Sequence, residues 1–187
     1  MRMGIFLLLW AFSFASGLGA AESSEVPWRK VGPGGGGWIQ SPLASRHGPD
    51  TFYVGCDVGG FYRSDDGGGT YAVHTEGFQD YFVESLAEHP SDPQILYAGC
   101  KSGVYKSVDG GRTWTWLREG FPPVQEYAYS AMVSKVALDP QRPETVYAAI
   151  GQPREERGGQ GALYRSEDGG ATWRQVVRPG QLPADLP

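Results

Sequence analysis

The feature that most constrains the fold of this 187-residue chain is an eight-residue pattern that occurs three times. Its copies are residues 64–71 (SDDGGGTY), 107–114 (SVDGGRTW) and 166–173 (SEDGGATW). All three fit Ser-x-Asp-x-Gly-x-Thr-aromatic. Self-similarity at a spacing of several tens of residues is the signature of a repeat architecture. We therefore take this pattern as the organising unit of the chain.

Strand-like segments flank each copy in the same order. Two short segments rich in Val, Ile, Phe and Tyr precede each copy, one follows it, and a further one opens the second and third repeats. Such segments, separated by Gly, Pro and Asp, are typical of strands. The 28 glycines and the aromatic content of 13% also favour an all-β class. Four antiparallel strands per repeat predict a β-propeller, of which residues 22–187 supply about three blades.

The repeated pattern itself predicts a tight turn between the third and fourth strands of each blade. The Asp carboxylate is expected to accept hydrogen bonds from turn amides, the glycines to adopt positive φ, and the Thr hydroxyl to close the turn. A structural role is therefore favoured over a metal-binding or catalytic one, and no metal site is predicted. The residues given this structural role are Ser64, Asp66, Gly68, Thr70, Ser107, Asp109, Gly111, Thr113, Trp114, Ser166, Asp168, Gly170, Thr172 and Trp173.

The first 21 residues are typical of an export signal. Arg2 gives a positive start, residues 5–15 are almost wholly apolar, and residues 19–21 are small. The apolar run is too short to span a membrane. We therefore expect a secreted or periplasmic protein that begins near residue 22. Export permits a disulfide between Cys56 and Cys100, but equivalent positions in neighbouring blades can be too far apart to bridge, so both states stay open.

The charge pattern bears on partners. The formal net charge is −5, and no basic cluster occurs, which argues against nucleic acid because phosphate binding needs concentrated Lys and Arg. Cys and His do not cluster at metal-ligand spacing, and no cofactor is expected.

The repeated pattern resembles the Asp-box (BNR) repeat family. That family includes sialidases, family 74 glycoside hydrolases, sortilin-type receptors and a photosystem assembly factor, so the box indicates fold and not function. A Gly-rich run at residues 31–37 precedes a strand and then DVGGFYR at residues 57–63. This order is most similar to the N-terminal part of family 74 enzymes, which include xyloglucanases.

The family 74 resemblance implies that Asp57 is the general base of an inverting glycoside hydrolase. The family's second acid comes from a second propeller, for which this chain has no matching segment, so the chain alone is predicted to be inactive. The first blade departs from the family because it carries a full box with Tyr71, and Cys56 replaces a small polar residue. The alternative is that Asp57 simply caps its turn.

Successive turns of an antiparallel blade alternate between two faces. The boxes are expected on one face, and Asp57 on the other, together with the connections between blades. Aromatic residues in those connections either stack on sugar rings or pack between blades, and both alternatives stay open. The candidate substrate-binding residues are Tyr81, Phe82, Tyr127 and Tyr129; Phe78 and Phe121 lie in the same connections. Extra length falls on this face at residues 118–134 and 151–161.

Two functions follow from these observations. The first is an extracellular polysaccharide hydrolase of the β-glucan or xyloglucan type. The second is a non-catalytic propeller, sortilin-like or assembly-factor-like, that binds a protein or a glycan. Three blades leave open strand edges. Further blades are therefore expected either from a longer chain or from another protomer.

Overall fold

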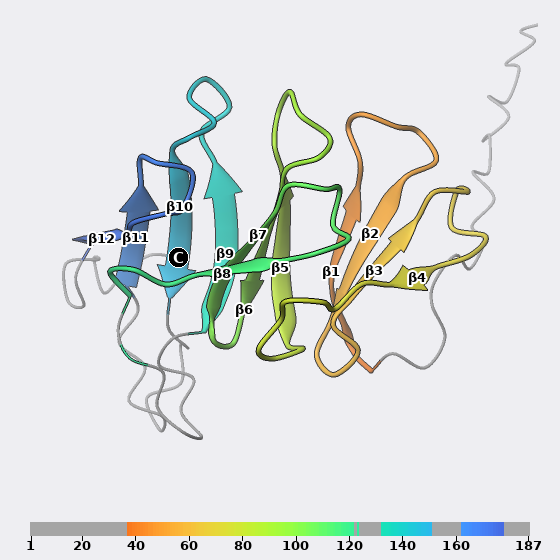
Figure 1. Cartoon of the computed structure of the whole chain (residues 1–187), viewed down its shortest axis with the longest axis horizontal. Coiled ribbons are helices and arrows are strands. Elements are labelled where there is room, and N and C mark those ends of the chain that lie inside the picture. Colours follow the sequence, from red (N-terminus) through yellow and green to blue (C-terminus); the bar gives the residue numbers. More distant parts are fainter. Residues whose placement is uncertain (1–36, 122, 124–131, 151–161, 178–187) are drawn as a thin grey trace, which may run out of the picture. The chain divides into compact units, whose positions relative to one another are not determined.

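The computed structural model describes residues 37–121, 123, 132–150 and 162–177. These residues form strands and turns and no helix (Figure 1). The described strands make three four-stranded sheets, and the strands of each sheet pair antiparallel in chain order. The predicted all-β class with four antiparallel strands per repeat is thereby confirmed. The predicted export signal lies outside the described residues.

Each sheet contains one copy of the repeated pattern, between its third and fourth strands. The first sheet comprises β1 (Ile39–Ala44), β2 (Phe52–Cys56), β3 (Phe61–Ser64) and β4 (Ala72–Val73). The second comprises β5 (Val83–Glu88), β6 (Leu96–Cys100), β7 (Gly103–Ser107) and β8 (Thr115–Leu117). The third comprises β9 (Val133–Leu138), β10 (Val146–Ile150), β11 (Ala162–Ser166) and β12 (Arg174–Val177).

The repeated turn is closed by its own side chains, as the second copy shows. The Ser107 hydroxyl donates to Asp109 Oδ1 at 2.7 Å and accepts the Gly111 amide at 2.8 Å. Asp109 in turn accepts the Thr113 amide at 2.9 Å and the Thr113 hydroxyl at 2.7 Å. The other two turns contain the same four bonds. A Ser, an Asp and a Thr at fixed spacing therefore supply the side-chain hydrogen bonds that close each turn.

These hydrogen bonds hold the three turn carboxylates ionised. Bonds donated by Thr70 and Ser64 lower the pKa of Asp66 to about 2, and the equivalent bonds lower the pKa of Asp168 to about 2. Partial burial acts to raise the pKa of Asp109, but the bonds outweigh it and bring the pKa to about 2. A carboxylate that accepts several hydrogen bonds is stabilised in its charged form. These groups are thus poor candidates for proton transfer near neutral pH.

The three sheets pack face against face, and β1, β5 and β9 are neighbours. Two apolar clusters fill the two junctions, one centred on Phe61 and Trp114 and the other on Val136 and Trp173. Because the second sheet is covered on both faces, all five residues of β6 are buried. In β10 only alternate residues are buried. The core of the molecule is therefore the space between sheets.

Hydrogen bonds also cross both junctions at equivalent positions. The Ser41 hydroxyl accepts the Leu86 amide at 3.0 Å, and the Ser85 hydroxyl accepts the Val136 amide at 3.0 Å. Each bond gives an inner-strand amide an acceptor in the preceding sheet. Buried amides need such partners, because an unpaired one costs about 1–3 kcal/mol.

A Glu-Gly-Phe segment (the Glu-Gly-Phe link) follows the fourth strand of the first sheet, at residues 76–78. The Glu76 carbonyl accepts the Trp114 amide of the next sheet at 2.9 Å. Phe78 packs against Trp114 and Tyr105, with ring centroids 5.0 and 4.8 Å apart. Gly77 has φ +93°, and a Cβ at this position would lie 1.8 Å from the Trp114 carbonyl oxygen. The link therefore needs glycine to pass so close to the neighbouring backbone.

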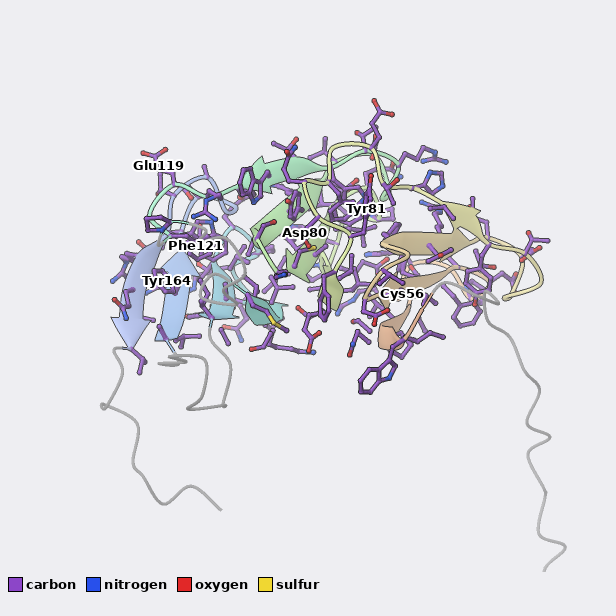
Figure 2. The ribbon with its side chains drawn as sticks, turned by 90° about the horizontal axis from the view of Figure 1, so that it is seen from below. Cys56, Asp80, Tyr81, Glu119, Phe121 and Tyr164 are labelled. Carbon is purple, nitrogen blue, oxygen red and sulfur yellow. The ribbon has the colours of Figure 1, made fainter. Side chains whose placement is uncertain are left out.

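The same link recurs at residues 119–121. The Glu119 carbonyl accepts the Trp173 amide at 2.8 Å, and Phe121 packs on Trp173 and Tyr164 at 4.8 and 5.0 Å (Figure 2). The sequence left open whether the aromatic residues of the connections stack on sugars or pack between blades. Phe78 and Phe121 pack between neighbouring sheets.

Both cysteines are buried free thiols. Burial raises the pKa of Cys56 and, more strongly, that of Cys100. The sequence left open whether Cys56 and Cys100 form a disulfide, and in the structure they do not. The described part of the chain contains no helix that is long and apolar enough to cross a membrane.

Candidate functional site

The repeated turns lie beside the turns that join the first and second strands of each sheet. In every sheet a turn glycine amide donates to a carbonyl of that neighbouring turn at 2.9 Å. The pairs are Gly67 with Asp50, Gly110 with Gln94, and Gly169 with Glu144. These turns therefore share one face of the sheets.

Asp57 lies at the other ends of the strands, directly after β2. The Gly60 amide, in the same β2–β3 turn, donates to the Tyr81 carbonyl at 3.1 Å. This bond joins the Asp57 turn to the β4–β5 connection, and Figure 2 shows Tyr81 where the first and second sheets meet. Asp57 and Tyr81 therefore share the face opposite the repeated turns.

Backbone bonds on both sides fix the position of Asp57. Its Oδ1 accepts the Trp38 amide at 2.7 Å, and its own amide donates to the Trp38 carbonyl at 3.1 Å. Its Oδ2 accepts no hydrogen bond from any described residue. The side chain is half-buried. Asp57 thus has one carboxylate oxygen that a backbone amide holds in place.

Gly37 makes this arrangement sterically feasible. It has φ +93°, and a Cβ at this position would lie 2.3 Å from Asp57 Oδ1 and 2.4 Å from Val58 Cγ2. No larger residue fits there without displacing the carboxylate. The last glycine of the Gly-rich run is therefore part of the site, because it lets the chain cross directly over Asp57.

The predicted aromatic residues are only partly brought together. Tyr81 is exposed beside the Asp57 turn, whereas Phe82 is half-buried and its carbonyl accepts the Lys101 amide of the β6–β7 turn at 3.2 Å. Tyr127, Tyr129 and the insertion at residues 151–161 lie outside the described residues.

Asp80, beside Tyr81, was not singled out from the sequence. Its Oδ1 accepts the Phe82 amide at 3.0 Å, and its Oδ2 accepts the Ser102 amide at 3.0 Å and the Ser102 hydroxyl. Tyr105 adds a hydroxyl contact to Ser102 at 2.7 Å. These bonds anchor the β4–β5 connection to the second sheet. Asp80 therefore holds the loop that presents Tyr81.

A further ionisable residue close to Asp80 in the sequence is Glu84. It lies at the bulge between Val83 and Ser85 in β5, and burial raises the pKa of its carboxyl. A bulge can re-aim a side chain near a site. A lone Glu within a short strand has no sequence signal that would single it out. Among the described residues, no group of three or more His, Cys, Asp or Glu side chains is placed to hold a metal ion.

Comparisons with known proteins show that the chain is similar in sequence to parts of xyloglucanases. The chain is 28% identical over 185 residues to a xyloglucanase from Paenibacillus sp, a match that covers 89% of this chain and 17% of the relative. It is 34% identical over 121 residues to the xyloglucanase Xgh74A of Acetivibrio thermocellus, covering 56% of this chain and 13% of the relative. The chain thus spans less than a fifth of either relative's length. No protein-family model matches it.

Solved structures support the fold independently. An ancestral family 74 glycoside hydrolase superposes with a TM-score of 0.62 at 21% identity, over 80% of this chain and 19% of that one. YCF48 from Cyanidioschyzon merolae superposes with a TM-score of 0.55 at 19% identity, over 80% of this chain and 40% of that one. At these identities the likeness shows the fold alone. Together, the comparisons show homology to family 74 xyloglucanases and a propeller-like arrangement of sheets.

Proposed function

We propose that this chain is part of an extracellular glycoside hydrolase that cleaves xyloglucan-type β-glucans with inversion, and that Asp57 is its general base. The observation that carries the proposal is the state of the Asp57 carboxylate. One oxygen is fixed by Trp38, and the other has no hydrogen-bond partner among the described residues. The homology to xyloglucanases supplies the substrate class.

In an inverting reaction, a carboxylate removes a proton from the water that attacks the anomeric carbon. A second carboxyl, roughly 6.5–9.5 Å away, protonates the leaving oxygen. Asp57 suits the first role, because a fixed and partly exposed carboxylate can hold a water on one side of a sugar. We assign the second role to a part of the whole enzyme that lies beyond this chain. The chain alone is then expected to bind substrate but not to cleave it.

The proposal includes the architecture of the chain. Residues 1–21 are an export signal, and residues 22–187 supply about three Asp-box blades of a propeller that further blades complete. The four self-contained hydrogen bonds in each repeated turn support this assignment.

The test is to measure release of reducing ends from xyloglucan by the whole protein in which this chain occurs. Asp57→Ala and Asp57→Asn should lower kcat by about 10²–10⁴-fold, the usual contribution of a general base. Asp92→Asn, a change on the opposite face, is the matched control. Wild-type activity in Asp57→Ala would refute the assignment. NMR of the first-formed product should show inverted anomeric configuration, and retention would refute the mechanism.

A non-catalytic propeller that binds a protein or a glycan is the second candidate. The fold similarity to YCF48 supports it, because a propeller of this kind need not carry catalytic groups. Saccharide binding without hydrolysis by the whole protein would favour this candidate.

A further inference from the structure

Exposed apolar side chains gather around Asp57. The described residues include seven large exposed hydrophobic side chains, and four of these adjoin the Asp57 turn. They are Trp38 (72% exposed), Ile39 (43%), Val58 (69%) and Tyr81 (52%). The remaining three lie elsewhere, on β4, in the second repeated turn and on β8. A local concentration of exposed apolar surface commonly marks a binding site.

Trp38 is held by its backbone and not by its ring. Both its amide and its carbonyl bond to Asp57, and the next residue, Ile39, pairs with Cys56 at the start of β1. The indole nevertheless remains largely in solvent. The fold therefore fixes the base of the side chain beside the carboxylate while leaving the aromatic face open.

Tyr81 reaches the same turn from a different chain segment. A Cβ on Gly60 would lie 3.6 Å from Tyr81 Cδ1 and 3.7 Å from Tyr81 Cβ, so the tyrosine rests against the end of the Asp57 turn. Asp80 anchors the loop immediately before it. Two residues with exposed aromatic side chains, on separately anchored segments, thus adjoin the Asp57 turn.

The chemistry of this patch selects its ligand. Aromatic faces pack on the C–H faces of pyranose rings, and a carboxylate oxygen accepts sugar hydroxyls. The patch formed by Trp38, Ile39, Asp57, Val58 and Tyr81 contains one anion and no cation. An acidic saccharide would meet like charge there, and a neutral one would not.

We propose that Trp38 and Tyr81 form an aromatic platform that binds a neutral β-glucan chain alongside Asp57. This inference rests on the proposed function and deepens it, because it names residues that position the sugar. Trp38 is the main contact, since it combines the largest ring with the greatest exposure in the patch.

The test measures binding of cellohexaose and xyloglucan oligosaccharides to the full chain by isothermal titration calorimetry. Trp38→Ala retains both backbone bonds to Asp57, so the fold should persist, as thermal unfolding will verify. We expect Trp38→Ala to weaken binding at least tenfold and Trp38→Phe to retain most of it. Val108→Ala removes another exposed apolar side chain, 67% exposed in the second repeated turn, and should leave binding unchanged.

Wild-type affinity in Trp38→Ala would overturn the platform, as would the absence of any saccharide binding or a preference for polygalacturonate. Asp57→Asn in the whole protein separates this inference from the proposed function. Loss of binding in Trp38→Ala with no hydrolysis by the wild type would leave the platform standing without the enzyme. Hydrolysis that depends on Asp57 but has an unchanged KM in Trp38→Ala would leave the enzyme standing without the platform.

Discussion

Gly77→Ala tests whether the Glu-Gly-Phe link holds neighbouring sheets together. The glycine has φ +93°, and an added methyl group would lie 1.8 Å from the Trp114 carbonyl oxygen. The Ala variant therefore meets two costs. The left-handed backbone costs roughly 1 kcal/mol for a residue with a Cβ, and the backbone contact forces the link away from the second sheet.

The second cost is the larger. Displacement breaks the bond between the Glu76 carbonyl and the Trp114 amide, worth about 1 kcal/mol. It also loosens Phe78 from Trp114 and Tyr105; complete loss of a buried Phe costs about 3–5 kcal/mol, and we expect about half of that. The expected loss is thus about 4 kcal/mol, a large share of the roughly 5–15 kcal/mol that typically stabilises a native domain.

Gly67→Ala is the matched control. It also has positive φ, at +69°, but the nearest atom to an added Cβ is 3.6 Å away. It should therefore show only the backbone cost, about 1 kcal/mol. Urea unfolding followed by tryptophan fluorescence gives both values. Equal destabilisation by the two substitutions would refute the claim that contact with the neighbouring sheet is what requires glycine at residue 77.

Three further predictions concern stability and thiol chemistry. Asp109→Asn should lower the unfolding temperature at pH 7, and the difference should shrink as pH falls from about 4 through about 2. The folded pKa of about 2 lies below the unfolded value, so the stabilisation is present above pH 4 and is lost as pH falls through the folded pKa. Cys56 and Cys100 should resist a thiol-specific disulfide reagent in the native protein and both react in urea, because both are buried. Ser85→Ala should cost about 1–3 kcal/mol in urea unfolding, because an inter-sheet amide loses its acceptor, whereas Ser134→Ala, at an exposed position, should stay within about 0.5 kcal/mol.

The elements that could be predicted from the sequence are those whose causes are local. The repeated turn closes on itself through residues at most four positions apart, as in Ser107, Asp109 and Thr113. The strands could be predicted because short runs of apolar residues, bounded by turn residues, are a local signal in the sequence. The opposite placement of Asp57 follows from the alternation of turns along an antiparallel sheet.

The missed features depend on a neighbouring sheet. Glu-Gly-Phe occurs twice in the sequence, yet its role is visible only in the structure, where Gly77 passes the Trp114 backbone and Gly120 passes the Trp173 backbone. The burial of Phe78 also depends on the neighbouring sheet. An aromatic residue in a connection can face either solvent or the next sheet, and the sequence pattern is the same in both cases. Asp80 was missed because its partner, Ser102, lies in the following sheet.

The turn carboxylates and Asp57 differ in how their oxygens are hydrogen-bonded. Both carboxylate oxygens of Asp66, Asp109 and Asp168 accept hydrogen bonds from Ser and Thr hydroxyls of the same turn, so each of these carboxylates takes part in closing its turn. Asp57 has no Ser or Thr at the equivalent spacing, and among the described residues only Oδ1 accepts a hydrogen bond. Gly59 and Gly60, which follow in the same turn, have no side-chain donor that could compete for Oδ2. Replacing Gly59 by Ser would test this reasoning: a hydroxyl that engaged Oδ2 should reduce activity in the whole protein while leaving the oligosaccharide affinity of the chain nearly unchanged.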